Sequence, residues 1–179
     1  NAGYEIINIS WGSMEDESGK NPNEEKYAKI LATLNEKGCI VVTSAGNNGF
    51  KVDSGKSNPD DSYLRTGGSN YYGYNASFAT NGEVSSPAAS VFAYVSSTSQ
   101  NSRACMRNDA GFVSGTSFSS PLTSGVAAAV LDRIKKNKIL YEKLDGPKRV
   151  ALVNRVISAS MIAGTVKLFR ALKLIDEWI

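Results

Sequence analysis

A short run that joins a flexible turn to a long apolar stretch constrains this chain most. It reads GTSFSSP over residues 115–121, and LTSG then leads into the apolar residues 126–131. Gly115 leaves room for close backbone approach, and Pro121 is tolerated in the first turn of a helix, where its missing N–H has no partner. The run therefore predicts a buried helix that carries Ser117 at its N-terminus, where the helix dipole and free N–H groups can stabilise a developing oxyanion.

Gly-Thr-Ser before an apolar helix is also typical of an ordinary loop with a Ser or Thr N-cap, so this run alone leaves both interpretations open. Two further segments decide between them. Residues 41–49 read VVTSAGNNG, and residues 7–12 read INISWG. In this order and at this spacing, the three segments together resemble the subtilisin-like serine peptidases, the subtilases.

The resemblance implies roles for residues in all three segments. Ser117 falls on the family's nucleophile, and Asn47 falls on the asparagine whose side-chain amide joins the Ser117 backbone N–H in the oxyanion hole. The other implied positions bind substrate, and they are Ser10, Trp11, Gly12, Ser44, Ala45, Gly46, Gly115 and Thr116. A peptide or protein substrate would bind there as an added strand, with backbone hydrogen bonds for affinity and pockets for selectivity.

The sequence contains no histidine. In the family, the catalytic aspartate and histidine precede the segment that matches residues 8–12. The resemblance therefore implies that residues 1–179 are the C-terminal portion of one catalytic domain, whose partner is the missing N-terminal portion. Because the serine of a Ser-His-Asp triad gives its proton to the imidazole, we expect the chain to be nearly inactive alone. The missing portion would also leave a sheet edge and apolar surface open to self-association.

Some positions depart from the family pattern. Leu122 stands where histidine is usual and Phe118 where methionine is common, and both changes affect packing more than chemistry. Sedolisin-like relatives place aspartate at the oxyanion position, so Asn47 favours the subtilisin branch. The competing function is a pseudopeptidase, a non-catalytic interaction module that binds extended peptides without cutting them. An upstream aspartate and His-Gly pair would favour the enzyme.

The order of the expected elements indicates an α/β fold. Residues 4–9 and 39–45 are predicted strands, joined by a helix with Asn21 as N-cap, Pro22 as first residue and Gly38 as its end. This unit predicts a parallel sheet flanked by helices, with the candidate residues at its carboxyl edge. The apolar face of that helix is formed by Tyr27, Ile30, Leu31 and Leu34. Loops are expected over residues 50–82, with a weak strand at 63–66; strands follow at 91–95 and 112–113, and helices from 147 and from 166.

Composition limits the partners. A net charge of +3 is too small to indicate a nucleic-acid partner, and no run approaches the roughly 18 apolar residues of a membrane span. The glycine clusters at residues 46–49 and 66–69 lack the Lys-Ser/Thr ending of a phosphate-binding loop. The chemistry requires no cofactor and no catalytic metal, although the resemblance allows a structural calcium ion. The resemblance also implies a secreted or extracytoplasmic protein.

Two features stay open at this level. Cys39 is predicted to be a buried small side chain, and sequence separation does not decide whether it pairs with Cys105. The acidic residues Glu15, Asp16 and Glu17 follow Ser-Trp-Gly, as in the kexin-like branch, where such residues help to select basic substrates. A solvated surface loop is the competing interpretation of this acidic run.

Overall fold

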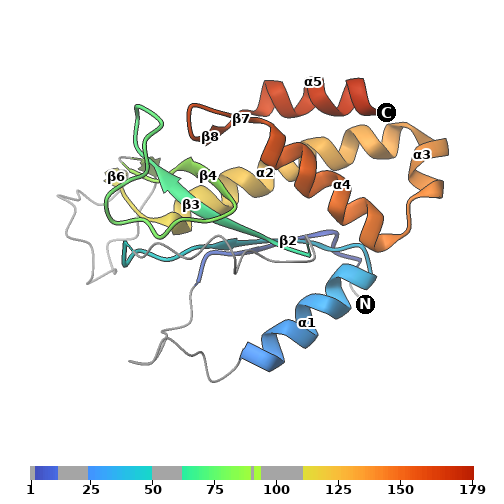
Figure 1. Ribbon diagram of the computed structural model, residues 1–179, viewed down its shortest axis with the longest axis horizontal. Coiled ribbons are helices and arrows are strands. Elements are labelled where there is room, and N and C mark those ends of the chain that lie inside the picture. Colours follow the sequence, from blue (N-terminus) through green and yellow to red (C-terminus); the bar gives the residue numbers. More distant parts are fainter. Residues whose placement is uncertain (1–2, 12–23, 50–61, 90, 94–110) are drawn as a thin grey trace.

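A four-stranded parallel sheet forms the centre of the protein, seen in a computed structural model that describes residues 3–11, 24–49, 62–89, 91–93 and 111–179 (Figure 1). Its strands are β1 (Ile6–Ile9), β2 (Ile40–Ser44), β3 (Leu64–Ser69) and β4 (Val84–Pro87), which pair in that order. The register places Ile6 opposite Ile40 and Thr66 opposite Val84. The predicted fold class, a parallel sheet flanked by helices, is confirmed.

Helices cover both faces of this sheet. One face packs against α2 (Thr116–Lys136), α4 (Gly146–Ala159) and α5 (Leu168–Trp178), and α1 (Glu24–Glu36) lies on the other face (Figure 1). The short helix α3 (Lys138–Lys143) links α2 to α4. Two antiparallel pairs complete the described part: β5 (Val91–Ala93) with β6 (Gly111–Val113), and β7 (Met161–Ile162) with β8 (Thr165–Val166).

The core lies between the sheet and the three helices on its first face. Its members are apolar and almost fully buried: Ile40, Val42, Leu64, Val84, Ala127, Val130, Leu131, Ile134, Val150, Val153, Val156, Ile157, Val166, Ala171 and Ile175. Burying one such Val, Leu or Ile side chain contributes roughly 1.5–3 kcal/mol. Because α2 contacts all four strands, the helix that begins beside Ser117 is held by the whole sheet.

The weak strand expected at residues 63–66 is present as the interior strand β3, but it extends to Ser69, so the expectation of loops is wrong for residues 67–69. The glycines of this stretch mark close packing rather than a turn. A Cβ on Gly68 would lie 2.5 Å from the Cβ of Ala88, and one on Gly67 would lie 2.9 Å from the backbone nitrogen of Gly82. Glycine therefore belongs here because neighbouring segments approach the strand closely, which the periodicity of one segment does not reveal.

The apolar face predicted for α1 is only partly buried. Leu31 and Leu34 are half-buried, but Tyr27 is 38% exposed and Ile30 is 56% exposed. Among the described elements, α1 packs mainly against β2 and α4, so only part of its face meets a neighbour. The predicted cap residues Asn21 and Pro22 lie outside the described residues. The later strands and helices occur where they were expected, as β5, β6, α4 and α5.

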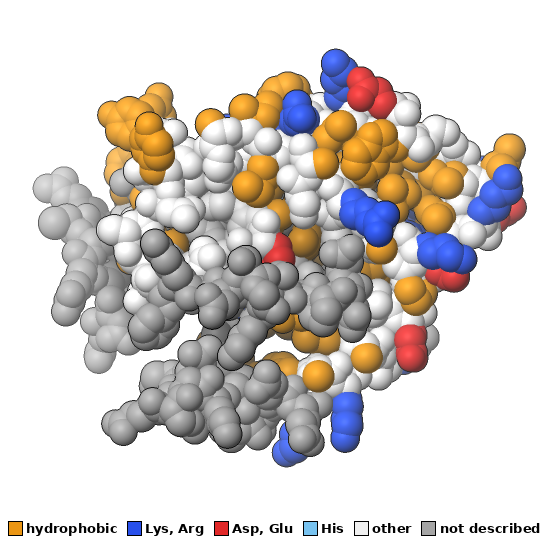
Figure 2. All heavy atoms as spheres, viewed as in Figure 1, with side chains coloured by type: hydrophobic (Ala, Val, Ile, Leu, Met, Phe, Trp, Pro, Cys, Tyr) orange, Lys and Arg blue, Asp and Glu red, His pale blue; other side chains and the backbone are white. Residues whose placement is uncertain are grey.

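Charge follows the helices. On the face shown in Figure 2, the Lys and Arg side chains that are drawn lie over helices, away from the carboxyl ends of the strands. No helix in the described ranges is both long and apolar enough to cross a bilayer. Within those same ranges, no three His, Cys, Asp or Glu side chains gather where they could hold a metal ion.

Candidate active site

The three segments singled out in the sequence meet at the carboxyl edge of the sheet. Ser10 follows β1, Ser44 ends β2, and the N-terminus of α2 lies against both. Hydrogen bonds join them directly: Ser10 bonds to Ser117 from β1, and Asn47 bonds to Thr116 from the loop after β2. Parallel strands bring their carboxyl ends to one edge, which is why residues more than 100 positions apart share one site.

Ser117 is the second residue of α2 and is half-buried. Its backbone N–H lies in the first turn, where N–H groups have no acceptor within the helix. Gly115 precedes the helix and supplies no side-chain cap. The Ser117 hydroxyl donates to the backbone carbonyl of Ser10 at 3.1 Å. The hydroxyl and the N–H of this residue are therefore both placed at the helix start, as the sequence predicted.

Pro121 is not in the first turn of α2, and that part of the prediction is wrong. The helix begins at Thr116, which makes Pro121 its sixth residue. In a regular helix the N–H of residue 121 would donate to the carbonyl of Ser117, but proline has no N–H. Ser10 Oγ donates to that carbonyl instead, at 2.9 Å. The side chain of Ser10, which directly follows β1, thus replaces the hydrogen bond that proline cannot donate, and proline is tolerated at this position.

The side chain of Asn47 is held by its oxygen. Asn47 Oδ1 accepts from the Thr116 backbone N–H at 2.9 Å and from Thr116 Oγ1 at 3.0 Å. Thr116 Oγ1 accepts in turn from the Gly46 N–H at 3.1 Å. With its oxygen engaged twice, the amide turns its NH₂ group away from Thr116, and Nδ2 lies beside Gly115. This orientation presents a donor next to the N-terminus of α2.

The remaining predicted substrate-binding residues lie around this turn. Ser44 and Ala45 are half-buried at the end of β2, and the Ala45 N–H donates to the Thr66 carbonyl at 3.0 Å. Gly46 has a φ of +102°, a backbone conformation that side chains disfavour. Trp11 is 76% exposed just beyond β1. Gly12 lies outside the described residues.

Two open features of the sequence receive partial answers. Cys39 is buried with a free thiol, and its Sγ lies 2.9 Å from the Tyr4 carbonyl oxygen. Cys105 lies outside the part of the chain that is described, and so does the acidic run Glu15, Asp16 and Glu17.

The sequence analysis missed Asn8 and its partners. Ser120 Oγ donates to Asn8 Oδ1 at 2.6 Å, and Asn8 Nδ2 donates to Ser10 Oγ at 2.8 Å. Ser124 Oγ lies 3.3 Å from the same Asn8 oxygen and 3.0 Å from the Ser120 carbonyl oxygen. One signal was present: Asn8 is a polar residue between two isoleucines in a short apolar strand, on the face it shares with Ile6 and Ser10. Its side chain is exposed, so the strand pattern alone does not require these partners.

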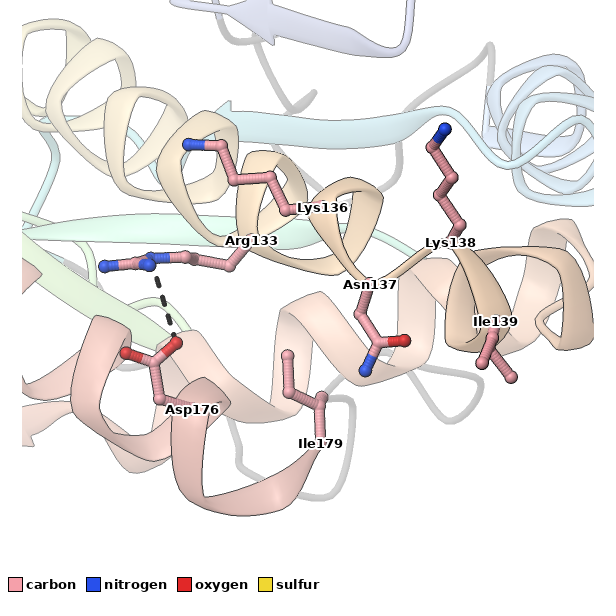
Figure 3. A pocket seen from close by; sticks show the side chains of 7 residues that line it. All are labelled: Arg133, Lys136, Asn137, Lys138, Ile139, Asp176 and Ile179. Atoms are coloured by element: carbon pink, nitrogen blue, oxygen red, sulfur yellow. Dashed lines mark ion pairs between the residues drawn. The ribbon is translucent and has the colours of Figure 1, made fainter.

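A pocket lies at the other end of α2. It has a volume of about 580 Å³, and Figure 3 shows the side chains that line it. Arg133 Nε faces Asp176 Oδ1 at 3.7 Å, and Lys136 pairs with Asp132 at 2.6 Å. These cations near the C-terminus of α2 favour its dipole and are paired with acidic neighbours. The pocket lies a full helix length from Ser117 and is separate from the site.

Comparison with known sequences decides the family once this geometry is in place. The sequence model of the Subtilase family matches residues 1–148. The chain belongs to the subtilase family. In this subtilase, Ser117, Asn47 and the strand end at Ser10 lie together at one edge of the sheet, as the sequence analysis expected. No curated protein was found to match this subtilase.

Solved structures share its fold. The patellamide maturation protease PatA matches with 23% identity and a TM-score of 0.68 over 98% of this chain and 64% of PatA. A lanthipeptide protease matches with 18% identity and a TM-score of 0.69 over 97% of this chain and 62% of the other. A protease from Pseudoalteromonas arctica matches with 18% identity and a TM-score of 0.65 over 96% and 51%. The chain thus spans between about half and two thirds of these proteases.

Proposed function

We propose that this subtilase chain supplies the nucleophile and the oxyanion hole of a subtilisin-type serine endopeptidase. The observation that carries the proposal is the orientation of Asn47. Two hydrogen bonds from Thr116 engage Oδ1, so Nδ2 is the group left to donate beside the first turn of α2. A side-chain amide and a backbone N–H at the start of one helix form the donor pair that an acyl-transfer oxyanion needs.

The proposed reaction uses these groups in order. Ser117 Oγ attacks the carbonyl carbon of the peptide bond, and the carbonyl oxygen becomes the oxyanion bound by the Ser117 N–H and Asn47 Nδ2. The hydroxyl proton passes to a base, which later returns it to the leaving amine. Because the sequence contains no histidine, the base is proposed to be a histidine, oriented by an aspartate, from a segment outside these residues. Before the attack, the Ser117 hydroxyl turns from the Ser10 carbonyl to that base, so that its proton can be transferred.

An extended peptide is the proposed substrate. Ser10, Trp11 and Gly12 would pair with its backbone on one side, and residues 44–46 would wall the first specificity pocket on the other. Small side chains at Ser44 and Ala45, with Gly46 next to them, leave space for a substrate side chain. The exposed Trp11 offers apolar surface beside it.

Labelling with a fluorophosphonate tests the proposal. The reagent needs an activated serine, so the 179-residue chain alone should label slowly. The complete protease domain, meaning this chain together with a segment that carries the aspartate and histidine, should label rapidly. Ser117→Ala should abolish that labelling, and the matched variant Ser158→Ala, on the exposed side of α4, should not change it. Rapid labelling of Ser117 in the chain alone would contradict the assignment of the base.

The second candidate is a peptide-binding pseudopeptidase. It is favoured by one observation: the Ser117 hydroxyl donates to a backbone carbonyl and not to a basic group. The same experiment separates the two functions. A complete domain that binds extended peptides but neither labels nor cleaves them would establish the binding module.

A further inference from the structure

Asn8, Ser10 and Ser117 form a continuous row of hydrogen bonds, which holds the first turn of α2 against the end of β1. Asn8 Nδ2 donates to Ser10 Oγ at 2.8 Å, and Ser10 Oγ donates to the Ser117 carbonyl at 2.9 Å. In the opposite direction, Ser117 Oγ donates to the Ser10 carbonyl at 3.1 Å. Each serine side chain therefore binds the backbone carbonyl of the other, and Asn8 adjoins this pair.

Pro121 makes the contact from Ser10 necessary. The carbonyl of Ser117 has lost the helix donor that residue 121 would normally provide. A carbonyl that is left without a donor in a partly buried turn costs free energy, and the first turn of α2 would relax toward another donor. The hydroxyl of Ser10 prevents this only while its proton points to Ser117.

Asn8 determines where that proton points. Ser120 Oγ on α2 donates to Asn8 Oδ1 at 2.6 Å. With its oxygen engaged by this hydroxyl group, the amide presents its NH₂ group to Ser10. Ser10 Oγ accepts from that group, so its own proton is free for the Ser117 carbonyl. The orientation of the Asn8 amide therefore decides whether the Ser10 proton points to Ser117.

We propose that Asn8 is a positioning residue for the nucleophile. It fixes the donor direction of Ser10, and Ser10 then holds the backbone of Ser117 so that its hydroxyl and N–H keep their places at the start of α2. Asn8 does not contact the reacting atoms, and its link to the nucleophile runs through Ser10. The proposal deepens the proposed peptidase function and rests on it.

The first test is a double-mutant cycle on kcat in the complete protease domain. Asn8→Ala should lower kcat about tenfold, the size expected for one neutral hydrogen bond, with little change in KM. In a Ser10→Ala background the same substitution should have almost no further effect, because Asn8 acts through Ser10. Full additivity of the two losses, or an unchanged kcat in Asn8→Ala, overturns the positioning role.

The second test reverses one bond without changing the size of the side chain. In Asn8→Asp the introduced carboxylate accepts from Ser120 but no longer donates to Ser10, so the Ser10 hydroxyl turns toward it. The kcat ratio of this variant to the parent, measured at each pH, should be low at neutral pH. It should rise as the introduced carboxyl is protonated near its ordinary pKa of about 4, since the acid form donates again. A ratio that falls or stays flat on acidification contradicts the proposal.

A matched control separates positioning from general destabilisation. Asn137 caps α3 at the far end of α2, where its Oδ1 accepts from the Leu140 N–H at 3.1 Å. Asn137→Ala should lower Tm and leave kcat unchanged. Equal losses of kcat in Asn137→Ala and Asn8→Ala would show that Asn8 contributes only to stability.

A double-mutant cycle on Tm in the 179-residue chain tests the Ser10–Ser117 hydrogen bond without an activity measurement. Ser10→Ala should lower Tm in the parent chain. It should lower Tm much less in a Pro121→Ala background, because the N–H of the introduced alanine donates to the Ser117 carbonyl. Equal Tm losses in both backgrounds overturn the contact. Absence of Ser117-dependent activity in the complete domain would instead overturn the proposed function, and the positioning role with it, even if this cycle succeeds.

Discussion

At the scale of single residues, the site depends on which end of a side-chain amide is occupied. Asn47 has its oxygen held by Thr116, and Asn8 has its oxygen held by Ser120. The NH₂ group of Asn47 therefore lies beside Gly115, and the NH₂ group of Asn8 donates to Ser10. An aspartate at either position would reverse the available hydrogen bonds, because an ionised carboxylate only accepts.

Asn47→Ala is predicted to lower kcat of the complete protease domain by about a hundredfold to a thousandfold, the typical effect of losing one oxyanion donor. KM should change little, because that donor acts mainly on the transition state. Steady-state kinetics on a peptide substrate measure both constants. The neighbouring variant Asn48→Ala is the control and should match the parent, since Asn48 is exposed and has no role in the site. Unchanged turnover in Asn47→Ala would remove Asn47 from the mechanism.

At the scale of elements, close approach of backbones decides which residues the strands tolerate. Gly68 in β3 packs against Ala79, which precedes β4 in the chain, and against Ala88, which follows it. Gly125 in α2 has open space where a Cβ would be. The two glycines therefore have different reasons to be present, although the sequence presents them alike.

Gly68→Ala is predicted to lower the free energy of unfolding by about 1–3 kcal/mol, because the added methyl would lie 2.5 Å from the Cβ of Ala88. Gly125→Ala is the matched control in the 179-residue chain, and it should raise the free energy by about 0.5–1 kcal/mol through helix propensity. Urea unfolding of both variants measures the difference. Equal effects of the same sign would show that β3 does not pack as described.

The N-terminus of α4 makes stability depend on pH. Asp145 Oδ1 accepts from the Lys148 backbone N–H at 2.9 Å, and this hydrogen bond, helped by the Lys148 side chain, lowers the pKa of the Asp145 carboxyl. A folded-state pKa below the unfolded value means that the carboxylate stabilises the fold above the unfolded pKa. That contribution is lost as pH falls through the folded-state pKa.

Asp145→Asn should therefore make Tm change less with pH, since asparagine still caps the helix but does not titrate. We expect a lower Tm than the parent at pH 7 and a smaller difference at pH 3. Thermal unfolding at the two pH values measures it. A Tm difference that grows on acidification would contradict the described cap.

At the scale of the whole molecule, β1 is one of the two edge strands of the four-stranded sheet. Among the described strands, β1 pairs only with β2. Beside it, a small pocket of about 280 Å³ between β1 and α2 is lined by Ile6, Ala128 and Leu131, with charged residues at its rim. An unpaired strand edge next to apolar surface is a site for association with another chain.

We predict that the 179-residue chain self-associates in a concentration-dependent manner, because pairing along β1 would cover this edge. Sedimentation velocity at several concentrations measures it. Adding a segment that carries the aspartate and histidine should suppress the association, since the segment would occupy the same edge. A chain that stays monomeric at all concentrations would contradict association along β1.

The sequence by itself determined the family and the α/β class and singled out Ser117 and Asn47 as candidates, because these depend on short motifs whose order and spacing are read along the chain. It also located most helices, since an apolar periodicity reports one buried face. It predicted only the first half of β3, because the glycines of the second half resemble a turn until Ala88 and Gly82 are seen packed against them.

Only the tertiary structure decided how the motifs act on one another. Pro121 is tolerated in the second turn of α2 because Ser10, more than 100 residues earlier, donates a hydrogen bond to the Ser117 carbonyl. Proline itself has no N–H to donate to that carbonyl. Asn8 gained its place in the site in the same way, through hydroxyl groups from α2. Hydrogen-bond partners brought together from distant segments leave no periodic pattern in a sequence, so the direction of each bond is determined only when the chain is folded.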